Sequence, residues 1–338
     1  MMEILTFNFT TPLHIGTVKA EMDTSESILH SDSLYAAIVH AWAQLGVNLY
    51  DIVDEGGGPK FALSSMFPFC TVEGKEIYFL PVPKGVLKPD LADTNTGQKD
   101  IDKVQYMDMD WFRQLQPAGS LKIKKSDIKG KYLTAVEGFD ERFMSREVYP
   151  RVKVPRDQER EDPSPYYLER IFFQQGAGFY CLAIWDTPSV KQNVLAALRY
   201  LGDEGLGTDR HVGNGMFEVK ESKSGAGFLL SNDSAYKTNV SLFCPPKPSV
   251  LQDMLGGQAA YDLPIKRGGW MSRENYLSYR KKAVFMFREG GIFKTNETVV
   301  GQTVNLAPER TPRQLPEGES VWRCGKSIFL PIHRKTEP

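Results

Sequence analysis

The sequence has little of what redox, metal or membrane chemistry would require. Its four cysteines lie far apart without a CxxC pair, which argues against a zinc site and, without a secretion signal, against a disulfide scaffold. No apolar run approaches the roughly 18 residues that a spanning helix needs. The N-terminal stretch "MMEILTFNFTTPLHIG" is broken by polar residues, so we expect neither a signal peptide nor an anchor. We therefore expect a cytoplasmic protein without a metal, a cofactor or a membrane partner.

A general excess of basic residues is also absent. The formal net charge is -1, whereas a free-standing nucleic-acid-binding domain usually carries a large basic excess. Lysines and arginines are nevertheless clustered at residues 122–131, 151–156 and 266–282. Basic patches on a near-neutral body suggest a narrow track for an anionic ligand. A lysine run such as 122–131 can equally be solvated surface.

The spacing of the apolar residues predicts both strands and helices, as in an α+β fold. The run "EILTFNFTT" alternates with a period of two and predicts a strand. Ser31 or Asp32 can cap a following helix, in which apolar residues recur at helical spacing until Gly46. Next come a predicted hairpin, "FALSSMFPFC" and "KEIYFLPVP", and, much later, a helix from about residue 190 to 201.

This order predicts a ferredoxin-like (RRM-like) domain over residues 1–222, in which the first and last strands, 2–10 and 214–221, are neighbours. An insertion of about 85–187 would lie between its third strand and its second helix. Within the insertion, "YPRVKVPR" and "PYYLERIFF" predict two strands around a protruding tip. Residues 238–338 repeat the architecture in outline, and the small polar residues of 222–237 mark the boundary.

Two glycine-containing loops can bind an anion. The loop "GLGTDRHVGNG" at 205–215 follows a helix and precedes a strand, which excludes a dinucleotide fingerprint, and no P-loop occurs. Its backbone N–H groups could form a concave anion site with Arg210 as the charged clamp, or it could be a turn without a ligand. In "DLPIKRGGW" at 262–270, Lys266 and Arg267 supply charge, while Trp270 could stack on a base or fill the core.

The hypothesis that the protein is an enzyme depends on His30, which precedes the first predicted helix. Histidine can serve as a general acid or base in metal-independent ribonucleases. Its candidate companions are His14, His40 and His211, and none has a spacing that defines a pair. We therefore predict no catalytic centre.

Seven stretches, in order along nearly the whole chain, resemble one family. They are "LHSDSLYAAI", "LSSMFPF...YFLPVP", "RVKVPR...YYLERIFFQQGAGFY", "GLGTDRHVGNGMFEV", "YDLPIKRGGW", "KKAVFMFREGGIF" and "VWRCGKSIFLPI". The family is the fourth subunit of Csm complexes, the type III-A CRISPR effectors. One departure is Pro155, which stands where the family pattern has an aspartate before an arginine.

The resemblance implies a RAMP-superfamily protein of the Cas-five-like group, with two ferredoxin-like domains, a helical insertion and a thumb-like hairpin at about 149–172. It implies a non-catalytic cap subunit that holds the repeat-derived 5′ tag of the guide RNA and bridges the large polymerase/nuclease subunit to the backbone RAMP subunits. The hairpin would lie beside the last tag nucleotide and keep the target RNA from pairing with the tag. The alternatives are a guide-processing endoribonuclease that uses His30 or His211, and the equivalent cap subunit of another type III subtype.

The predicted RNA-binding residues combine the start of the first helix, the hairpin and the two glycine-containing loops. They are His30, Ser31, Asp32, Arg151, Lys153, Arg156, Gly205, Gly207, Arg210, His211, Gly213, Asn214, Gly215, Lys266, Arg267, Gly268, Gly269 and Trp270.

Overall fold

The computed structural model describes residues 1–16, 23–90, 92–93, 96–154, 163–221, 224–228, 234–272, 278–308 and 320–333. Its largest sheet has the strand order β13-β1-β12-β3-β4-β6-β9-β8, and β2 also pairs with β12. The strands are β1 (Met2–Phe9), β2 (Phe61–Leu63), β3 (Phe67–Val72), β4 (Lys75–Pro81), β6 (Tyr106–Asp108), β8 (Ile128–Lys129), β9 (Tyr132–Leu133), β12 (Gly178–Trp185) and β13 (Phe217–Glu221). The α+β class predicted from the sequence is confirmed.

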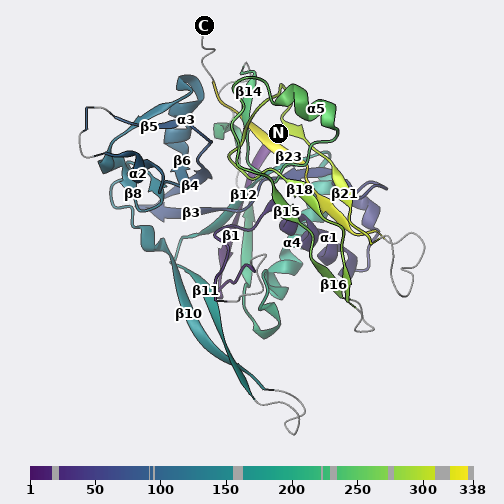
Figure 1. The fold of residues 1–338 in the computed structure, drawn as a ribbon. Coiled ribbons are helices and arrows are strands. Elements are labelled where there is room, and N and C mark those ends of the chain that lie inside the picture. The colour runs from purple at the N-terminus through teal and green to yellow at the C-terminus, as the bar shows by residue number, and fades with distance from the viewer. Residues whose placement is uncertain are drawn as a thin grey trace.

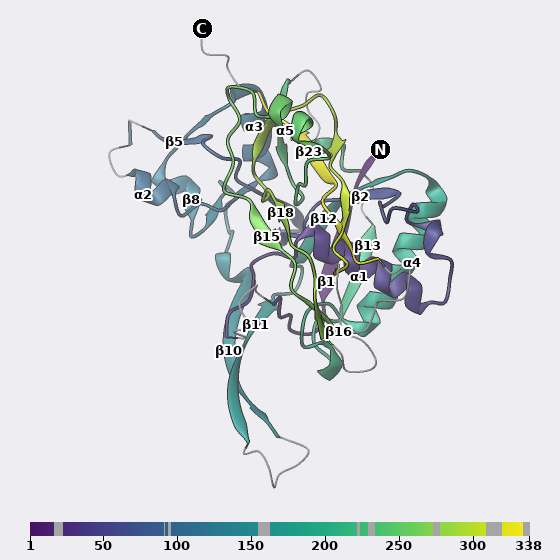
Figure 2. The same cartoon turned by 45° about the vertical axis from the view of Figure 1, so that its right-hand side comes forward.

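The predicted neighbours at the sheet's first edge are also confirmed. Strands β1 and β13 pair antiparallel, with Phe7 opposite Val219. Helices α1 (Ser31–Gln44) and α4 (Pro188–Glu204) contact each other, as Figures 1 and 2 show. The Thr187 side chain caps α4 by accepting the Val190 N–H, and a proline occupies the first turn. The α1 cap is His30 rather than Ser31 or Asp32, because both of these already lie inside the helix.

The predicted place of the insertion is wrong in one respect. Strand β12 falls inside residues 85–187, yet it lies between β1 and β3 in the middle of the sheet. The ferredoxin-like order is therefore β1-α1-β3-β12-α4-β13. Its third strand is β12, whereas the sequence predicted β4 in that position. Strand β4 instead extends the sheet outward from β3, with which it forms the predicted hairpin.

A long hairpin separates from the sheet. Strands β10 (Met144–Lys153) and β11 (Ser164–Phe173) pair antiparallel along their whole length and project away from the body in both views (Figures 1 and 2). This confirms two predicted strands, while their connecting tip lies outside the described residues. The remaining elements before the hairpin are β5 (Leu87–Pro89), α2 (Gln98–Ile101), α3 (Met109–Ala118) and β7 (Leu121–Ile123).

The C-terminal part forms a four-stranded sheet with the order β19-β14-β23-β20 and three two-stranded ribbons. The sheet strands are β14 (Tyr236–Asn239), β19 (Ile292–Lys294), β20 (Val299–Val300) and β23 (Ser327–Pro331), and α5 (Pro248–Met254) contacts β19. The ribbons pair β15 (Ile265–Arg267) with β18 (Val284–Met286), β16 (Trp270–Ser272) with β17 (Ser278–Arg280), and β21 (Thr303–Asn305) with β22 (Trp322–Cys324). No helix in the described ranges is long and apolar enough to cross a membrane.

Candidate nucleic-acid interface

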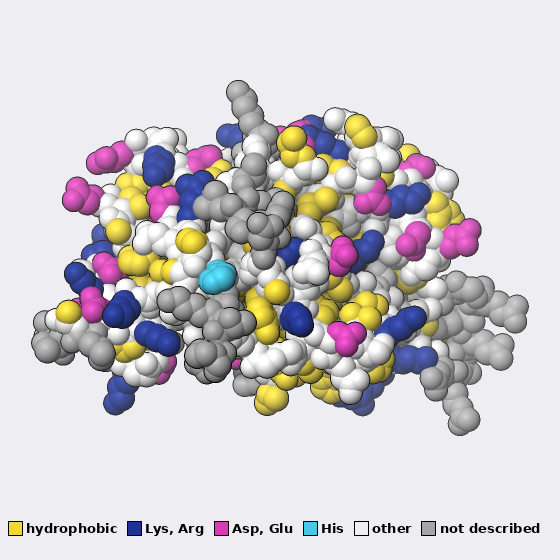
Figure 3. Space-filling view, turned by 90° about the horizontal axis from the view of Figure 1, so that it is seen from above, with side chains coloured by type: hydrophobic (Ala, Val, Ile, Leu, Met, Phe, Trp, Pro, Cys, Tyr) yellow, Lys and Arg dark blue, Asp and Glu magenta, His cyan; other side chains and the backbone are white. Residues whose placement is uncertain are grey.

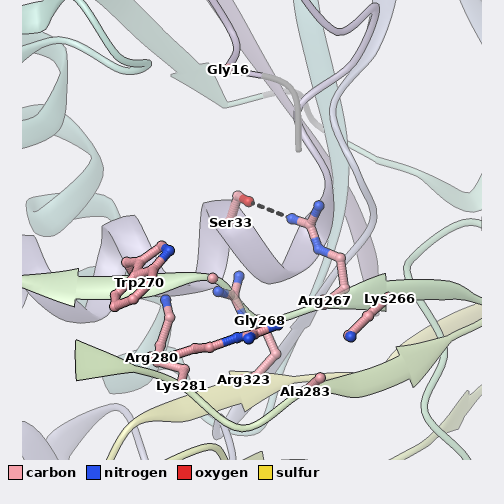
Figure 4. Close-up of a pocket in the computed structure, with 11 residues that line it drawn as sticks. Gly16, Ser33, Lys266, Arg267, Gly268, Trp270, Arg280, Lys281, Ala283 and Arg323 are labelled. Carbon is pink, nitrogen blue, oxygen red and sulfur yellow. Dashed lines mark hydrogen bonds between the residues drawn. The ribbon is translucent and has the colours of Figure 1, made fainter. Parts of the chain in front are cut away.

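A pocket of about 840 Å³ lies where the C-terminal ribbons meet the start of α1. Among the described residues, its walls carry five cationic side chains and no acidic one. The lining residues are Gly16, Ser33, Lys266, Arg267, Gly268, Gly269, Trp270, Arg280, Lys281, Ala283 and Arg323 (Figure 4). On the face seen from above, by contrast, basic and acidic side chains are interspersed (Figure 3). The pocket therefore concentrates positive charge that the net charge of the chain conceals.

Asp32 lies behind the pocket and is fully buried. Arg267 donates from Nε and Nη2 to the two Asp32 oxygens, at 2.7 and 2.9 Å, and Arg323 donates from Nη1 at 2.9 Å. Burial raises the pKa of Asp32, but the two arginines lower it by more, so this pKa lies below its ordinary value. The carboxylate is therefore charged at neutral pH.

Three further cations of the pocket have no acidic partner among the described residues: Lys266, Arg280 and Lys281. Burial, and next the neighbouring Arg323, lower the pKa of Lys281. Trp270 is 67% exposed and lies directly opposite Arg280 in the β16-β17 pair. A flat aromatic face beside a guanidinium group suits a stacked base with its phosphate. The alternative in which Trp270 fills the core is wrong.

The glycine-rich loop borders this region through residues 14 to 16. The Thr208 N–H donates to the His14 carbonyl oxygen at 3.1 Å, and Gly16 of the pocket packs so closely that an added Cβ would lie 2.7 Å from the Thr208 methyl. Arg210 and His211 belong to a short 3-10 helix and are exposed. The two predicted loops are thus neighbours, as one track would require.

The glycines of this loop serve the protein itself. The N–H groups of Gly205, Gly213 and Gly215 donate to the carbonyl oxygens of Leu201, Arg210 and Pro12, at 2.7, 2.9 and 2.8 Å. These three N–H groups are already used, so the predicted backbone anion site is wrong for them. The exposed side chain of Arg210 keeps its predicted place at the surface.

The loop also contacts the hairpin. Asp209 lies 3.1 Å from a guanidinium nitrogen of Arg151 and 3.6 Å from one of Arg170. Asn214 is buried and donates to the same carboxylate at 2.7 Å. Arg151 and the glycine-rich loop are thus brought together, although Arg151 is partly neutralised. Lys153 is placed by its backbone in β10, while Arg156 lies outside the described residues.

His30 and Ser31 are buried and have partners inside the protein. His30 Nδ1 lies 2.9 Å from the Glu289 carboxylate, which also accepts a hydrogen bond from Ser65. The Ser31 hydroxyl accepts the Leu242 N–H at 3.0 Å. His30, Ser31 and Asp32 were predicted to bind RNA, but all three side chains are buried and bind partners between the N- and C-terminal parts.

Sequence reasoning missed several residues of the site. Arg280 and Lys281 belong to the recognised 266–282 cluster, so their charge was a usable signal. Arg323 had no such signal, because it stands alone in "VWRCGK" and enters the pocket only through the β21-β22 ribbon. Within the described ranges, no group of three or more His, Cys, Asp or Glu side chains could hold a metal ion.

Comparison with known sequences finds two relatives of the same name. The chain is 27% identical over 279 residues to the CRISPR system Cms protein Csm4 of Thermococcus onnurineus (strain NA1), covering 80% of this chain and 83% of the relative. It is 20% identical over 387 residues to the protein of that name from Methanocaldococcus jannaschii, covering 99% and 98%. Residues 232–332 match the family model described as the CRISPR Csm4 C-terminal domain.

The fold is similar to that of two solved structures. One is a chain of the Csm3-Csm4 subcomplex in the type III-A CRISPR-Cas interference complex, with a TM-score of 0.60, 18% identity, and coverage of 98% of this chain and 100% of that chain. The other is a chain of the Csm1-Csm4 cassette in complex with AMPPNP, with a TM-score of 0.60, 19% identity and full coverage of both chains. The fold of the chain thus resembles that of chains in Csm complexes. Within that class, the predicted resemblance to Csm subunit four, Csm4, is confirmed.

Proposed function

We propose that this protein is the Csm4-type cap subunit of a type III-A CRISPR interference complex. In this role it holds the 5′ tag of the guide RNA without catalysing a reaction, and it bridges the large polymerase subunit to the backbone subunits. Residues 1–222 and 238–338 are its two proposed ferredoxin-like domains, and the β10-β11 hairpin lies near the point where target RNA begins to pair. The similarity to Csm4 proteins supports the assembly role.

The observation that carries the RNA-binding role is the cationic pocket. Five cations and an exposed tryptophan surround a space of about 840 Å³, and none of the described residues on its walls is acidic. A single strand is held by phosphate contacts together with stacked, unpaired bases, and the pocket offers groups for both. Arg210 on the adjacent loop extends the same positive surface.

The endoribonuclease alternative has less support. His30 is buried against Glu289 and Ser65, so it cannot reach an RNA strand on the surface. His211 is exposed on the glycine-rich loop. Incubating the protein with repeat RNA in EDTA tests this alternative directly, and cleavage that is lost in His211→Ala would establish it.

The RNA-binding role predicts a specific salt dependence. Each phosphate contact that is lost should flatten the slope of log affinity against log salt by roughly 0.7 for a single strand. We expect this change in Lys266→Ala, Arg280→Ala and Arg210→Ala when tag RNA is titrated across a salt series. Lys99→Ala removes an exposed lysine on α2 and serves as the control. Equal slopes in all four variants would place the RNA elsewhere, and the lysines of 122–131 would then be tested.

The bridging role is tested in the assembled complex. Affinity purification through the large subunit should recover the backbone subunits and guide RNA only when this protein is coexpressed. Recovery of the full set in its absence would contradict the bridge while leaving RNA binding open to the salt experiment.

A further inference from the structure

We propose that Asp32 is a positioning residue, which holds Arg267 and Arg323 in the orientation in which their guanidinium groups bind a phosphodiester of the RNA. This inference rests on the proposed RNA-binding function and names the residue that shapes its pocket. Asp32 itself does not touch the ligand, because its side chain is fully buried.

The geometry of the contact is that of a clamp. Arg267 binds the carboxylate side-on, with Nε 2.7 Å from Oδ2 and Nη2 2.9 Å from Oδ1. Arg323 donates to Oδ2 at 2.9 Å. Two parallel N–H···O bonds fix the plane of a guanidinium group as well as its position. Arg267 also donates to the Ser33 hydroxyl at 3.1 Å (Figure 4).

The three residues come from distant parts of the chain. Asp32 lies in the first turn of α1, whereas Arg267 ends β15 and Arg323 lies in β22. Neither ribbon alone is a rigid support, because each is a pair of three-residue strands. Through Asp32, helix α1 therefore fixes the positions of both guanidinium groups at the pocket.

The charges of the clamp do not balance. One carboxylate faces two guanidinium groups, which leaves one positive charge in a partly desolvated wall. Lys281 adds another, and its pKa is lowered by burial and then by Arg323 and Arg267. An anion in the pocket would relieve this repulsion.

Donors remain for that anion. Among the described residues, Nη1 of Arg267 and Nη2 of Arg323 have no hydrogen-bond partner. Guanidinium groups that use one edge on a carboxylate can offer the other edge to a phosphate. The chemical class that fits is therefore a phosphodiester anion.

The substitution Asp32→Asn separates positioning from simple charge. It removes a negative charge beside the pocket, so an electrostatic effect alone would tighten RNA binding. If Asp32 positions the arginines, binding should instead weaken, by about tenfold for the loss of one charged hydrogen-bonded contact. The measurement is the affinity of the purified full-length protein for a labelled single-stranded oligouridylate, with thermal unfolding as a check on folding.

Glu289→Gln is the matched control. It removes another buried carboxylate between the N- and C-terminal parts, yet Glu289 contacts His30 and Ser65 rather than a pocket arginine. We expect its RNA affinity to equal that of the wild type. Equal loss in both variants would mean that Asp32 acts only through stability, and the inference would be wrong.

Arg267→Lys keeps the positive charge but removes the planar guanidinium group and its paired N–H donors. This variant tests the inference if Asp32→Asn does not fold. It should weaken binding by a similar factor, whereas unchanged affinity would overturn the inference. A wild-type protein that does not bind the oligouridylate would refute the proposed function as well. A wild type that binds, together with Asp32→Asn that binds as well or better, would refute only the role of Asp32.

Discussion

At the scale of single residues, His30 shows how burial decides the role of a titratable group. Burial lowers the pKa of His30, but the adjacent Glu289 carboxylate outweighs it, and the pKa is raised overall. Burial likewise raises the pKa of Glu289, but His30 and the hydrogen bond from Ser65 together lower it below its ordinary value. Below pH 6.5 the pair is therefore ionised, and it is buried and shared between the N- and C-terminal parts.

This pair predicts a pH dependence of stability. Because the folded pKa of His30 is raised above 6.5, its stabilisation is complete below pH 6.5 and is lost as the pH rises through the folded pKa. The lowered pKa of Glu289 makes its contribution complete above pH 4.5. Urea unfolding should show the wild type losing stability above pH 6.5, while Glu289→Gln, less stable by about 2 kcal/mol at pH 6, loses none there. Parallel pH profiles of the two proteins would contradict this assignment.

The sequence identified His30 as unusual but could not identify its partner. Only neighbours in the chain are visible in a sequence, and Glu289 lies 259 positions away. The same reason explains why Asp32 was placed among the RNA-binding residues: its two arginine partners come from strands 235 and 291 positions further along. By contrast, Lys266 and Trp270 stand beside glycines and charges, which are local signals, and both side chains are exposed in the pocket.

At the scale of elements, the glycine-rich loop is shaped by internal close approaches. At Gly215, φ is +76° and an added Cβ would lie 1.9 Å from the Leu206 carbonyl oxygen. At Gly213, φ is +81° but nothing lies within 4 Å of an added Cβ. Both glycines thus have a positive φ, but only Gly215 lacks room for a side chain.

That difference makes a matched pair of substitutions. Gly213→Ala should cost roughly 1 kcal/mol from the left-handed conformation alone. Gly215→Ala should cost about 1–3 kcal/mol more, because the added methyl group forces backbone to move. Urea denaturation of both variants measures the difference. Equal losses would mean that the loop relaxes freely around Gly215.

Periodicity predicted most elements correctly and their order in the sheet less well. The strand at β1, the β3-β4 hairpin, the β10-β11 hairpin and helix α4 all carry local patterns. The central place of β12 does not, because an apolar run such as "GFYCLAIW" states that a strand is buried without stating between which partners. The sequence pattern predicts a first ferredoxin-like domain whose first three strands follow closely in the chain. In the structure, β12 pairs with β1 although more than 170 residues separate them.

At the scale of the whole molecule, the two proposed domains share buried polar contacts. The Ser65 N–H donates to the Val240 carbonyl oxygen at 2.9 Å, and the Ser241 hydroxyl donates to the Leu63 carbonyl oxygen at 2.8 Å. The Asp32 clamp and the His30-Glu289 pair cross the same boundary. One hydrophobic cluster also includes residues from both sides. Separation would leave buried charges and hydrogen-bonding groups without partners, which is costly.

We therefore predict that residues 1–222 and 238–338 fold only together. Expressed singly, each segment should be insoluble or should lack a cooperative unfolding transition, because each exposes the shared hydrophobic contacts and buried charges that the other segment covers. Coexpressed as separate chains, they should copurify, and Asp32→Ala should reduce the yield of the pair because it leaves Arg267 and Arg323 without their carboxylate. In the intact protein, tryptophan fluorescence and far-UV circular dichroism should report one coincident transition. A soluble C-terminal segment with its own cooperative transition would show instead that the domains are independent and that the buried ion pairs serve only to orient them.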